Sequence, residues 1–433
     1  MNDRINIFWF RRDLRLDDNV ALYHALTADC PVLPIFIFDT NILYGLSKDD
    51  ARVNFIHNHL SKINAQLQQL GSGLAMYHGK PLEIIAQLTK QYNIKAVYTN
   101  RDYQPYAISR DQSIEMLLDS LGVILKTYKD HVVFEKDEVV KQDGSSYKVY
   151  TPYMKQWKAK LATITLRSFD ANSRLDNLVK VSNLPHLSLS DIGFETTVQT
   201  IKYYKLTPAL IHNYEAERNF PVKDATSRLG PHLRFGTVSI RDIVRQATSE
   251  KNKTFLQELI WREFFTQILW HFPYTATKSF KPKYDRIHWR NNETEFNAWC
   301  EGKTGYPLVD AGMRQLNKTG FMHNRVRMLV GSFLCKHLLI DWRWGEAYFA
   351  EKLHDYEMAS NVGNWQWVAG CGVDAAPYFR IFNPTTQIKK FDENHNYIKE
   401  WVPDYQELTY PVPIVDHKFA RVRCLQVYKE ALS

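Results

Sequence analysis

The sequence has few cysteines and no paired cysteine motif. Its five cysteines are scattered over 433 residues without a CxxC pair, so neither a disulfide framework nor a zinc site is expected. The first ten residues lack the pattern of a signal peptide, and no apolar run approaches the roughly 20 residues of a membrane span. We therefore predict a cytoplasmic protein (nuclear if its source has a nucleus) with no metal site and no membrane segment.

The sequence also lacks a GxGxxG motif, so a dinucleotide bound in the usual Rossmann manner is not indicated. Short apolar runs nevertheless alternate with helical patterns through residues 1–130, and this order predicts a parallel α/β sheet. The expected strands are Ile5–Phe10, Val32–Phe38, Leu74–His78, Ala96–Asn100 and Val123–Tyr128. Because such sheets bind ligands at the carboxyl ends of their strands, Asp39 and Asn100–Tyr106 are candidate cofactor neighbours.

The length of the chain favours two domains. Hydrophobic periodicity fades over residues 131–200, and a long interdomain connection is the simplest interpretation of this stretch. From about Lys205 the patterns are helical, and they predict a helical domain over residues 201–433.

Positive charge and tryptophan are concentrated in the C-terminal part. Residues 1–130 carry 14 basic and 14 acidic residues, so the net charge of +8 lies after residue 130. Nine of the eleven tryptophans lie between Trp261 and Trp401. Cations neutralise phosphate and aromatic rings stack on bases and flavins, which indicates nucleic-acid binding, redox chemistry or both. Core packing and a general basic bias are the alternatives.

Two motifs combine charged and aromatic side chains before residue 300. In the first, Tyr214–Arg218 is followed by a turn at Thr226–Gly230, whose hydroxyls and N–H groups either hold a diphosphate or cap a helix. The second is a helix over 253–270. One of its faces carries Glu258, Trp261, Arg262 and Phe265. Its polar groups form either a site or an internal Glu258–Arg262 ion pair.

Two further motifs lie after residue 320. A helix that begins near Met322 places Asn324, Arg325 and Met328 on one face, and Arg327 points elsewhere, toward an acid such as Asp355. In the segment 355–367, Trp365 and Trp367 lie two residues apart, which would present one ring to a cofactor and the other to a ligand.

Taken together, these motifs resemble the photolyase/cryptochrome family, and within it the class I cyclobutane pyrimidine dimer photolyases. The resemblance is carried, in the family's order over nearly the whole chain, by FWFRRDLRLDDN, TSRLG, ELIWREF, EGKTGYPLVDAGMRQL, FMHNRVRM, NWQWVAG and DAAPYFRIFNP. It implies an α/β N-terminal domain and an all-α C-terminal domain that holds FAD in a bent form.

The resemblance also implies which residues contact the flavin. They are Tyr214, Thr226, Ser227, Arg228, Leu229, Gly230, Phe255, Arg262, Arg327, Asp355, Tyr356, Glu357 and Asn361. In this set the amide of Asn361 is expected to face N5 and to favour the reduced anionic flavin. Arg327 and Asp355 are expected to form a buried pair beside the ring.

The implied activity is light-driven repair of cyclobutane pyrimidine dimers in UV-damaged DNA by a monomeric lyase. Excited, reduced anionic FAD gives one electron to a flipped-out dimer, which splits and returns the electron. The implied substrate contacts are Arg218, Glu258, Trp261, Asn324, Arg325, Met328 and Trp367. Glu258 is expected to donate a hydrogen bond while protonated, and Trp261 and Trp367 to sandwich the dimer.

Trp365, Trp342 and Trp289 match the family's photoreduction chain, for which simple packing is the alternative. Relatives that repair (6-4) photoproducts use a histidine pair in this pocket. Asn324 and Met328 match the cyclobutane pattern instead, although His323 is adjacent.

The chain departs from many close relatives in two places. Phe321 stands where they have tryptophan, a change of ring that we expect to matter little. Tyr106-Ala107 stands where folate-antenna relatives have Asn-Glu, which disfavours a methenyltetrahydrofolate antenna and leaves a deazaflavin, a second flavin or no antenna open. The main functional alternative is a cryptochrome-type blue-light sensor. A dark flavin oxidoreductase is disfavoured because no nicotinamide motif is present.

Overall fold

The computed structural model describes residues 4–181 and 183–433. The chain divides into two compact units that alternate along the sequence. Unit 1 comprises Met1–Glu135, Leu161–Lys202 and Leu229–Ser249, and unit 2 comprises Lys136–Lys160, Tyr203–Arg228 and Glu250–Ser433. These units differ from the predicted divisions at residues 130 and 200. The stretch expected to be a connection is shared between both units, and residues 229–249 belong to unit 1.

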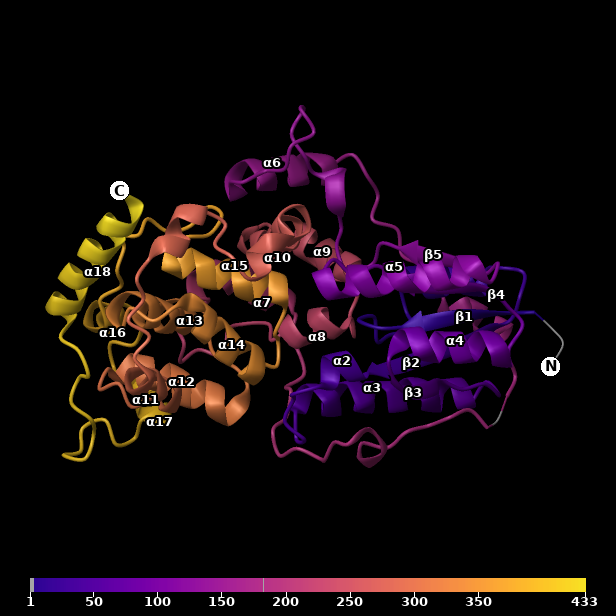
Figure 1. The fold of residues 1–433 in the computed structure, drawn as a ribbon, viewed down its shortest axis with the longest axis horizontal. Helices are drawn as coiled ribbons and strands as arrows, with labels where there is room; N and C mark the ends of the chain where they lie inside the picture. Colours follow the sequence, from indigo (N-terminus) through magenta and orange to yellow (C-terminus); the bar gives the residue numbers. More distant parts are fainter. Residues whose placement is uncertain (1–3, 182) are drawn as a thin grey trace. The chain divides into compact units, whose positions relative to one another are not determined.

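Unit 1 contains a five-stranded parallel sheet (Figure 1). Its strands are β1 (Ile5–Phe10), β2 (Val32–Asp39), β3 (Ala75–Gly79), β4 (Ile94–Asn100) and β5 (Ile124–Tyr128), in the order β3-β2-β1-β4-β5. All five predicted strands are present, with ends shifted by at most two residues. The sequence identified them because β1 and β2 are buried along their whole length and are therefore continuously apolar.

Successive residues of β1 supply separate cores on the two faces of the sheet. Phe8 and Phe10 pack with α1 (Val20–Leu26) and α3 (Ala51–Gln68). Ile7 and Trp9 pack with α4 (Pro81–Gln91) and α5 (Pro105–Ser120). The short helices α2 (Thr40–Leu43) and α8 (Gly230–Phe235) and the helix α9 (Ile240–Ser249) complete the α-helices of unit 1. The predicted α/β class is confirmed.

Unit 2 is helical. Its α-helices are α6 (Tyr150–Leu161), α7 (Pro208–Glu217), α10 (Thr254–His271), α11 (Glu293–Glu301), α12 (Pro307–Thr319), α13 (Asn324–Ser332), α14 (Trp342–Lys352), α15 (Met358–Ala369), α16 (Pro384–Phe391), α17 (Asn396–Trp401) and α18 (His417–Leu432). Helix α15 packs against α10, α13 and α14. Gly345 allows the close approach of α14, since a Cβ there would lie 2.2 Å from the ring of Trp365. The predicted all-α class of the C-terminal part is confirmed.

Helix α6 lies within the stretch that the sequence predicted to be a connection. Tyr150, Tyr153 and Trp157 form its buried face at spacings of three and four residues. Trp157 Nε1 donates a hydrogen bond to Glu263 Oε1 of α10 at 2.5 Å, which fixes α6 within unit 2. Within the described ranges, no helix is both long and apolar enough to cross a membrane.

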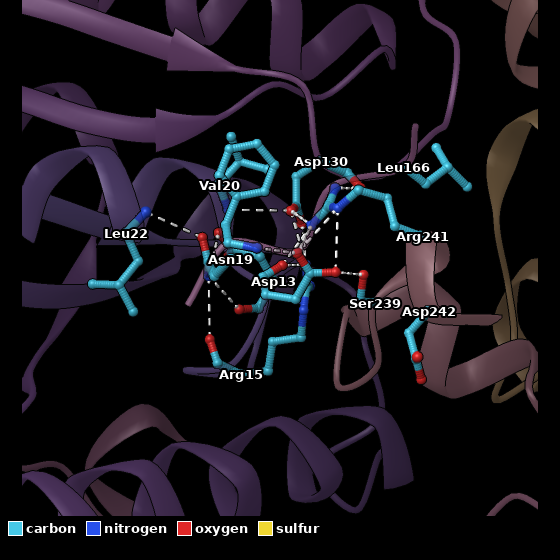
Figure 2. Close-up of polar contacts among 12 residues, drawn as sticks. Asp13, Arg15, Asn19, Val20, Leu22, Asp130, Leu166, Ser239, Arg241 and Asp242 are labelled. Atoms are coloured by element: carbon cyan, nitrogen blue, oxygen red, sulfur yellow. Dashed lines mark hydrogen bonds and ion pairs between the residues drawn. The ribbon is translucent and has the colours of Figure 1, made fainter. Parts of the chain in front are cut away.

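A buried ion-pair network joins α9 to the segment after β1 and to the residues that follow β5, all in unit 1 (Figure 2). Arg241 Nη2 lies 2.9 Å from Asp130 Oδ1, and its Nε lies 3.2 Å from both carboxylate oxygens of Asp18. Arg15 donates to both oxygens of Asp130 at 2.8 Å. Burial alone would raise the pKa of Asp130, but Arg15 and Arg241 outweigh it and hold that pKa well below its usual value. The network therefore anchors residues 229–249 to the sheet.

Candidate functional site

The predicted turn at residues 226–230 spans the division between the units, which falls after Arg228. Arg228 has a left-handed backbone with φ of 58°, an uncommon conformation for a residue other than glycine. Its guanidinium lies 3.6 Å from the centre of the Phe321 ring and 3.1 Å from Asp224. Phe321 thus provides the flat surface on which this arginine stacks.

Glu258 of α10 accepts a hydrogen bond from Arg218, the residue that follows α7. Burial would lower the pKa of Arg218, but the charge of Glu258 and this hydrogen bond outweigh burial and raise it. The sequence pattern had indicated only Arg262, one turn along the same helix, as a partner. In this contact Glu258 accepts, whereas the family resemblance implied a protonated donor.

Trp261 lies one turn after Gln257 on α10 and is half-buried. Its ring stacks on Tyr150 of α6, a residue that the sequence analysis did not single out. On the same helix, Phe255 packs edge-on against Tyr214 of α7, with ring centres 5.1 Å apart. Two of the predicted flavin contacts are therefore adjacent.

The helix α13 is preceded by a buried histidine, His323, and carries Arg325 and Arg327, for which the sequence predicted site roles. His323 caps it by accepting a hydrogen bond at Nδ1 from the Arg325 backbone N–H at 3.1 Å, while its Nε2 has no partner among the described residues. Arg325 donates to Asn219 Oδ1 at 2.5 Å and lies 3.7 Å from Met328 Sδ. Of the predicted shared face of Asn324, Arg325 and Met328, the contact between Arg325 and Met328 is present, and Asn324, the first residue of the helix, is exposed.

The pKa of His323 falls from 6.5 to about 4. Burial is the main cause, and the nearby arginine charges contribute further; they belong to Arg327, Arg228, Arg325 and Arg218. A neutral histidine surrounded by cations is a site that favours an anionic ligand.

The predicted pair of Arg327 and Asp355 is present, although it is partly accessible. Two parallel hydrogen bonds of 3.1 and 2.9 Å join the guanidinium to the carboxylate, with side chains 23% and 20% exposed. Arg327 Nε also donates to the Met322 carbonyl at 2.7 Å. This bidentate geometry fixes the plane of the guanidinium.

Asn361 of α15 is oriented by Glu346 of α14, which the sequence analysis missed. Its Nδ2 donates to the Glu346 carbonyl at 3.0 Å and to Glu346 Oε1 at 2.9 Å. Both amide hydrogens are thus used, and the Asn361 oxygen is the atom left to meet a ligand. Burial raises the pKa of Glu346. No local sequence pattern indicates this pair, because the residues lie on different helices.

The three tryptophans of the predicted electron chain differ in burial. Trp365 and Trp342 are buried, at 3% and 1% exposure, whereas Trp289 is partly accessible. Trp365 contacts Trp299, which is not one of the three predicted electron carriers, with ring centres 6.2 Å apart. Trp367, two residues after Trp365, is half-buried.

In unit 1, the candidate cofactor neighbours Asp39, Asn100 and Tyr106 are hydrogen-bonded to other residues of the unit. Tyr106 donates to Asp39 Oδ2 at 2.6 Å and accepts from Asn41 at 3.1 Å. Asn100 is buried and donates to Asp13 and to Asn19, so it serves the scaffold. Ala107 is buried as well.

The chemical types of the side chains in unit 2 match those that FAD requires. Its diphosphate needs cations and N–H donors, which the arginines provide together with His323 Nε2, an atom that has no partner in the described part of the chain. Its ring needs aromatic neighbours and polar groups at its edge, and the Tyr214–Phe255 pair, the Arg327–Asp355 pair and Asn361 provide these.

Comparisons with known proteins identify the family to which the chain belongs. The family described as DNA photolyase matches residues 6–172, and the FAD binding domain of DNA photolyase matches residues 255–409. A deoxyribodipyrimidine photo-lyase of Synechococcus sp. is 35% identical, covering 98% of this chain and 96% of its own.

Two solved structures are similar over almost the whole chain. A class III photolyase from Agrobacterium tumefaciens has a TM-score of 0.89 at 34% identity, covering 100% of this chain and 98% of its own. A cryptochrome from Synechocystis sp. has a TM-score of 0.86 at 26% identity, covering 99% of each chain.

Proposed function

Because this chain belongs to the DNA photolyase family and is an FAD-binding enzyme of DNA repair, we propose that it splits cyclobutane pyrimidine dimers in DNA under light. The observation that supports this proposal most is the cluster of arginines and aromatic rings in unit 2. When bound, reduced anionic FAD supplies one electron to the dimer on illumination and takes it back after the bonds break. The chain's own residues bind the cofactor and the damaged DNA, orient the dimer, and neutralise the phosphate charges.

On the flavin side, we assign the contacts named in the sequence analysis. Asn361, fixed by Glu346, presents an oxygen that accepts a hydrogen bond from the ring edge. Arg327, held flat by Asp355, supplies positive charge beside the ring and so favours its anionic form. Arg228, one of the cations around His323, takes the phosphates of the cofactor.

On the substrate side, an extruded dimer stacks against Trp261 and Trp367, because aromatic faces bind bases of any sequence. Arg325 and Arg218 neutralise phosphates of the damaged strand. Glu258 holds Arg218 in place through their ion pair and lies next to the carbonyl region of the dimer. Asn324 and Met328 line the base side, which is the basis for choosing cyclobutane dimers over (6-4) photoproducts.

We also propose that Trp365, Trp342 and Trp289 pass electrons inward to oxidised flavin. The gradient from two buried indoles to a partly accessible one suits a chain that ends at solvent. A Trp365→Phe variant should lose light-driven flavin reduction while chemically pre-reduced enzyme still repairs. Normal photoreduction in this variant would remove Trp365 from the chain of electron carriers.

The antenna, the location and the oligomeric state stay predictions. Tyr106 and Ala107 disfavour folate, and deazaflavin, a second flavin or no antenna are the choices that an absorption spectrum of the purified protein separates. All five cysteines are free thiols, which suits a reducing compartment such as the cytoplasm. We expect a monomer.

The decisive experiment mixes the flavin-reduced protein with an oligonucleotide that contains one dimer. We expect the ultraviolet absorbance of the intact pyrimidines to return under blue light and not in darkness. Equal recovery in both conditions would reject photorepair. Binding without recovery in either condition would favour the second candidate, a cryptochrome-type sensor. The similarity to the Synechocystis cryptochrome is the observation that favours this candidate.

A further inference from the structure

We propose that Tyr150 is a positioning residue that holds Trp261 in the orientation in which it stacks on an extruded pyrimidine dimer. This inference rests on the proposed function, since it assumes that Trp261 contacts the dimer. Tyr150 belongs to α6, in the stretch where the sequence predicted only a connection, and it lies outside the sequence motifs on which the family resemblance was based.

The two rings overlap face to face. Their centres lie 3.6 Å apart and their planes differ by 6°, while Tyr150 is 6% exposed. The other aromatic neighbours of Trp261 lie farther away, with ring centres at 5.7 Å for Phe264 and 5.6 Å for Phe265. One flat face of the indole is therefore covered by Tyr150, and a base that stacks on Trp261 must use the opposite face.

Anchors at both ends of Tyr150 fix this overlap. Aromatic pairs by themselves favour offset or edge-on arrangements, so a close face-to-face pair needs other restraints. The Tyr150 hydroxyl donates to the Gln257 carbonyl at 2.7 Å, and its backbone N–H donates to Asp374 Oδ2 at 3.0 Å. Gln257 precedes Trp261 by one helical turn, so the hydroxyl is tied to the same turn of α10 that carries the indole.

Two further residues of α6 contact α10 and so fix the helix that carries Tyr150. Trp157 is bonded to Glu263, and the ring of Tyr153 packs against Phe264 with centres 5.2 Å apart. Burial and the nearby charge of Glu258 raise the pKa of Tyr150, so its phenol remains a neutral donor. The residue therefore lies beside two proposed substrate contacts, Glu258 and Trp261, without extending the positive surface that binds phosphate.

The physical effect is preorganisation. A ring that is already fixed loses little freedom when a base stacks on it, whereas a loose indole must be ordered at the moment of binding. Removing the Tyr150 ring should thus weaken the contact with an extruded dimer and leave backbone contacts with undamaged DNA unchanged. A purely structural role would weaken both.

The test compares DNA affinity for dimer-containing and undamaged oligonucleotides, using FAD-loaded protein in the dark. Tyr150→Met, which fills the space without a ring, should weaken dimer binding ~10-fold and change undamaged binding less than about twofold. Tyr150→Phe, which keeps the ring and loses the Gln257 bond, should weaken dimer binding about threefold. Tyr147→Met is the matched control, since Tyr147 contacts Tyr153, and it should leave both affinities unchanged.

The coupling to Trp261 is tested in a second background. If Tyr150 acts through the indole, adding Tyr150→Met to Trp261→Leu should cause no further loss of dimer binding. Additive losses, or equal losses for damaged and undamaged DNA, would overturn the proposal. If Tyr150→Met does not fold, the Tyr150→Phe variant decides, and an unchanged dimer affinity there would overturn it. Light-dependent repair by the unmodified protein is measured separately, so a failure of the proposed function is distinguishable from a failure of this coupling.

Discussion

Units 1 and 2 both contain ion pairs between partly or fully buried side chains, but unit 2 also holds an arginine that no acid balances among the described residues. In unit 1, Asp18 and Asp130 meet Arg15 and Arg241, and every pair is closed within the protein. In unit 2, Arg325 has no carboxylate partner among the described residues, and burial together with Arg218 and Arg380 lowers its pKa.

The contrast separates a scaffold from a binding site. A buried ion pair with all partners present is costly to break but needs nothing further. Cations left close together in partly buried positions cost free energy in the unbound protein, and an anionic ligand recovers that cost. The unit 2 cluster is therefore where FAD and DNA phosphates are expected, and the unit 1 network is where they are not.

The largest expected effect is on the scaffold. Arg241→Met leaves the carboxylates of Asp18 and Asp130 without one of their partners, so it should lower the free energy of unfolding by about 3–5 kcal/mol. Urea denaturation measures this loss. The control is Asp242→Asn on the same helix, where the side chain is exposed and the change should stay within about 0.5 kcal/mol. Equal losses of stability at both positions would show that the buried ion-pair network contributes no more than an exposed residue.

A smaller effect concerns the pH dependence of stability. The pKa of His323 is about 4 in the folded protein and 6.5 ordinarily, so the unfolded chain takes up a proton that the folded chain does not between these values. The free energy of unfolding should therefore fall as the pH decreases from 6.5 to 4, by at most about 3.4 kcal/mol. His323→Asn keeps a capping oxygen for the Arg325 N–H and should flatten this slope in thermal melts. An identical slope in the variant would show that His323 is not its source.

The smallest expected effect is on binding and distinguishes the two units most clearly. Arg325→Ala should weaken binding of dimer-containing DNA by about 1–3 kcal/mol. It should change the stability of the unbound protein by no more than about 0.5 kcal/mol, because no carboxylate loses its partner. Fluorescence anisotropy and denaturation give the two values. Arg290→Ala, where the guanidinium is paired with Glu295 at 2.7 Å, is the control and should leave DNA affinity unchanged. If Arg325→Ala destabilised the protein without weakening DNA binding, Arg325 would be part of the scaffold and not of the binding site.

The sequence predicted local features well and distant partners poorly. The strands of unit 1 and helix α10 were found because apolar periodicity is a local property. Helix α6 was missed because its buried face rests on only three aromatic residues in a polar stretch. Spacing suggested Arg262 for Glu258, yet the structure pairs it with Arg218, 40 residues away.

The same limit explains the other omissions in the site and scaffold. The partners Glu346 and Asn361 lie on separate helices, and Arg241 is 223 residues from Asp18. The motifs named many residues of the site, but packing alone determines which of them touch. The Arg327–Asp355 pair was predicted because the helical spacing turns Arg327 away from its neighbours toward a distant acid, and the family resemblance implied the same pair.

The most direct test of the account is a crystal structure of the FAD-loaded protein with a dimer-containing oligonucleotide, grown and frozen in darkness. We predict that the dimer lies outside the DNA stack, against the face of Trp261 opposite Tyr150, with strand phosphates on Arg218 and Arg325. A dimer still stacked within the DNA, or bound to unit 1, would contradict it.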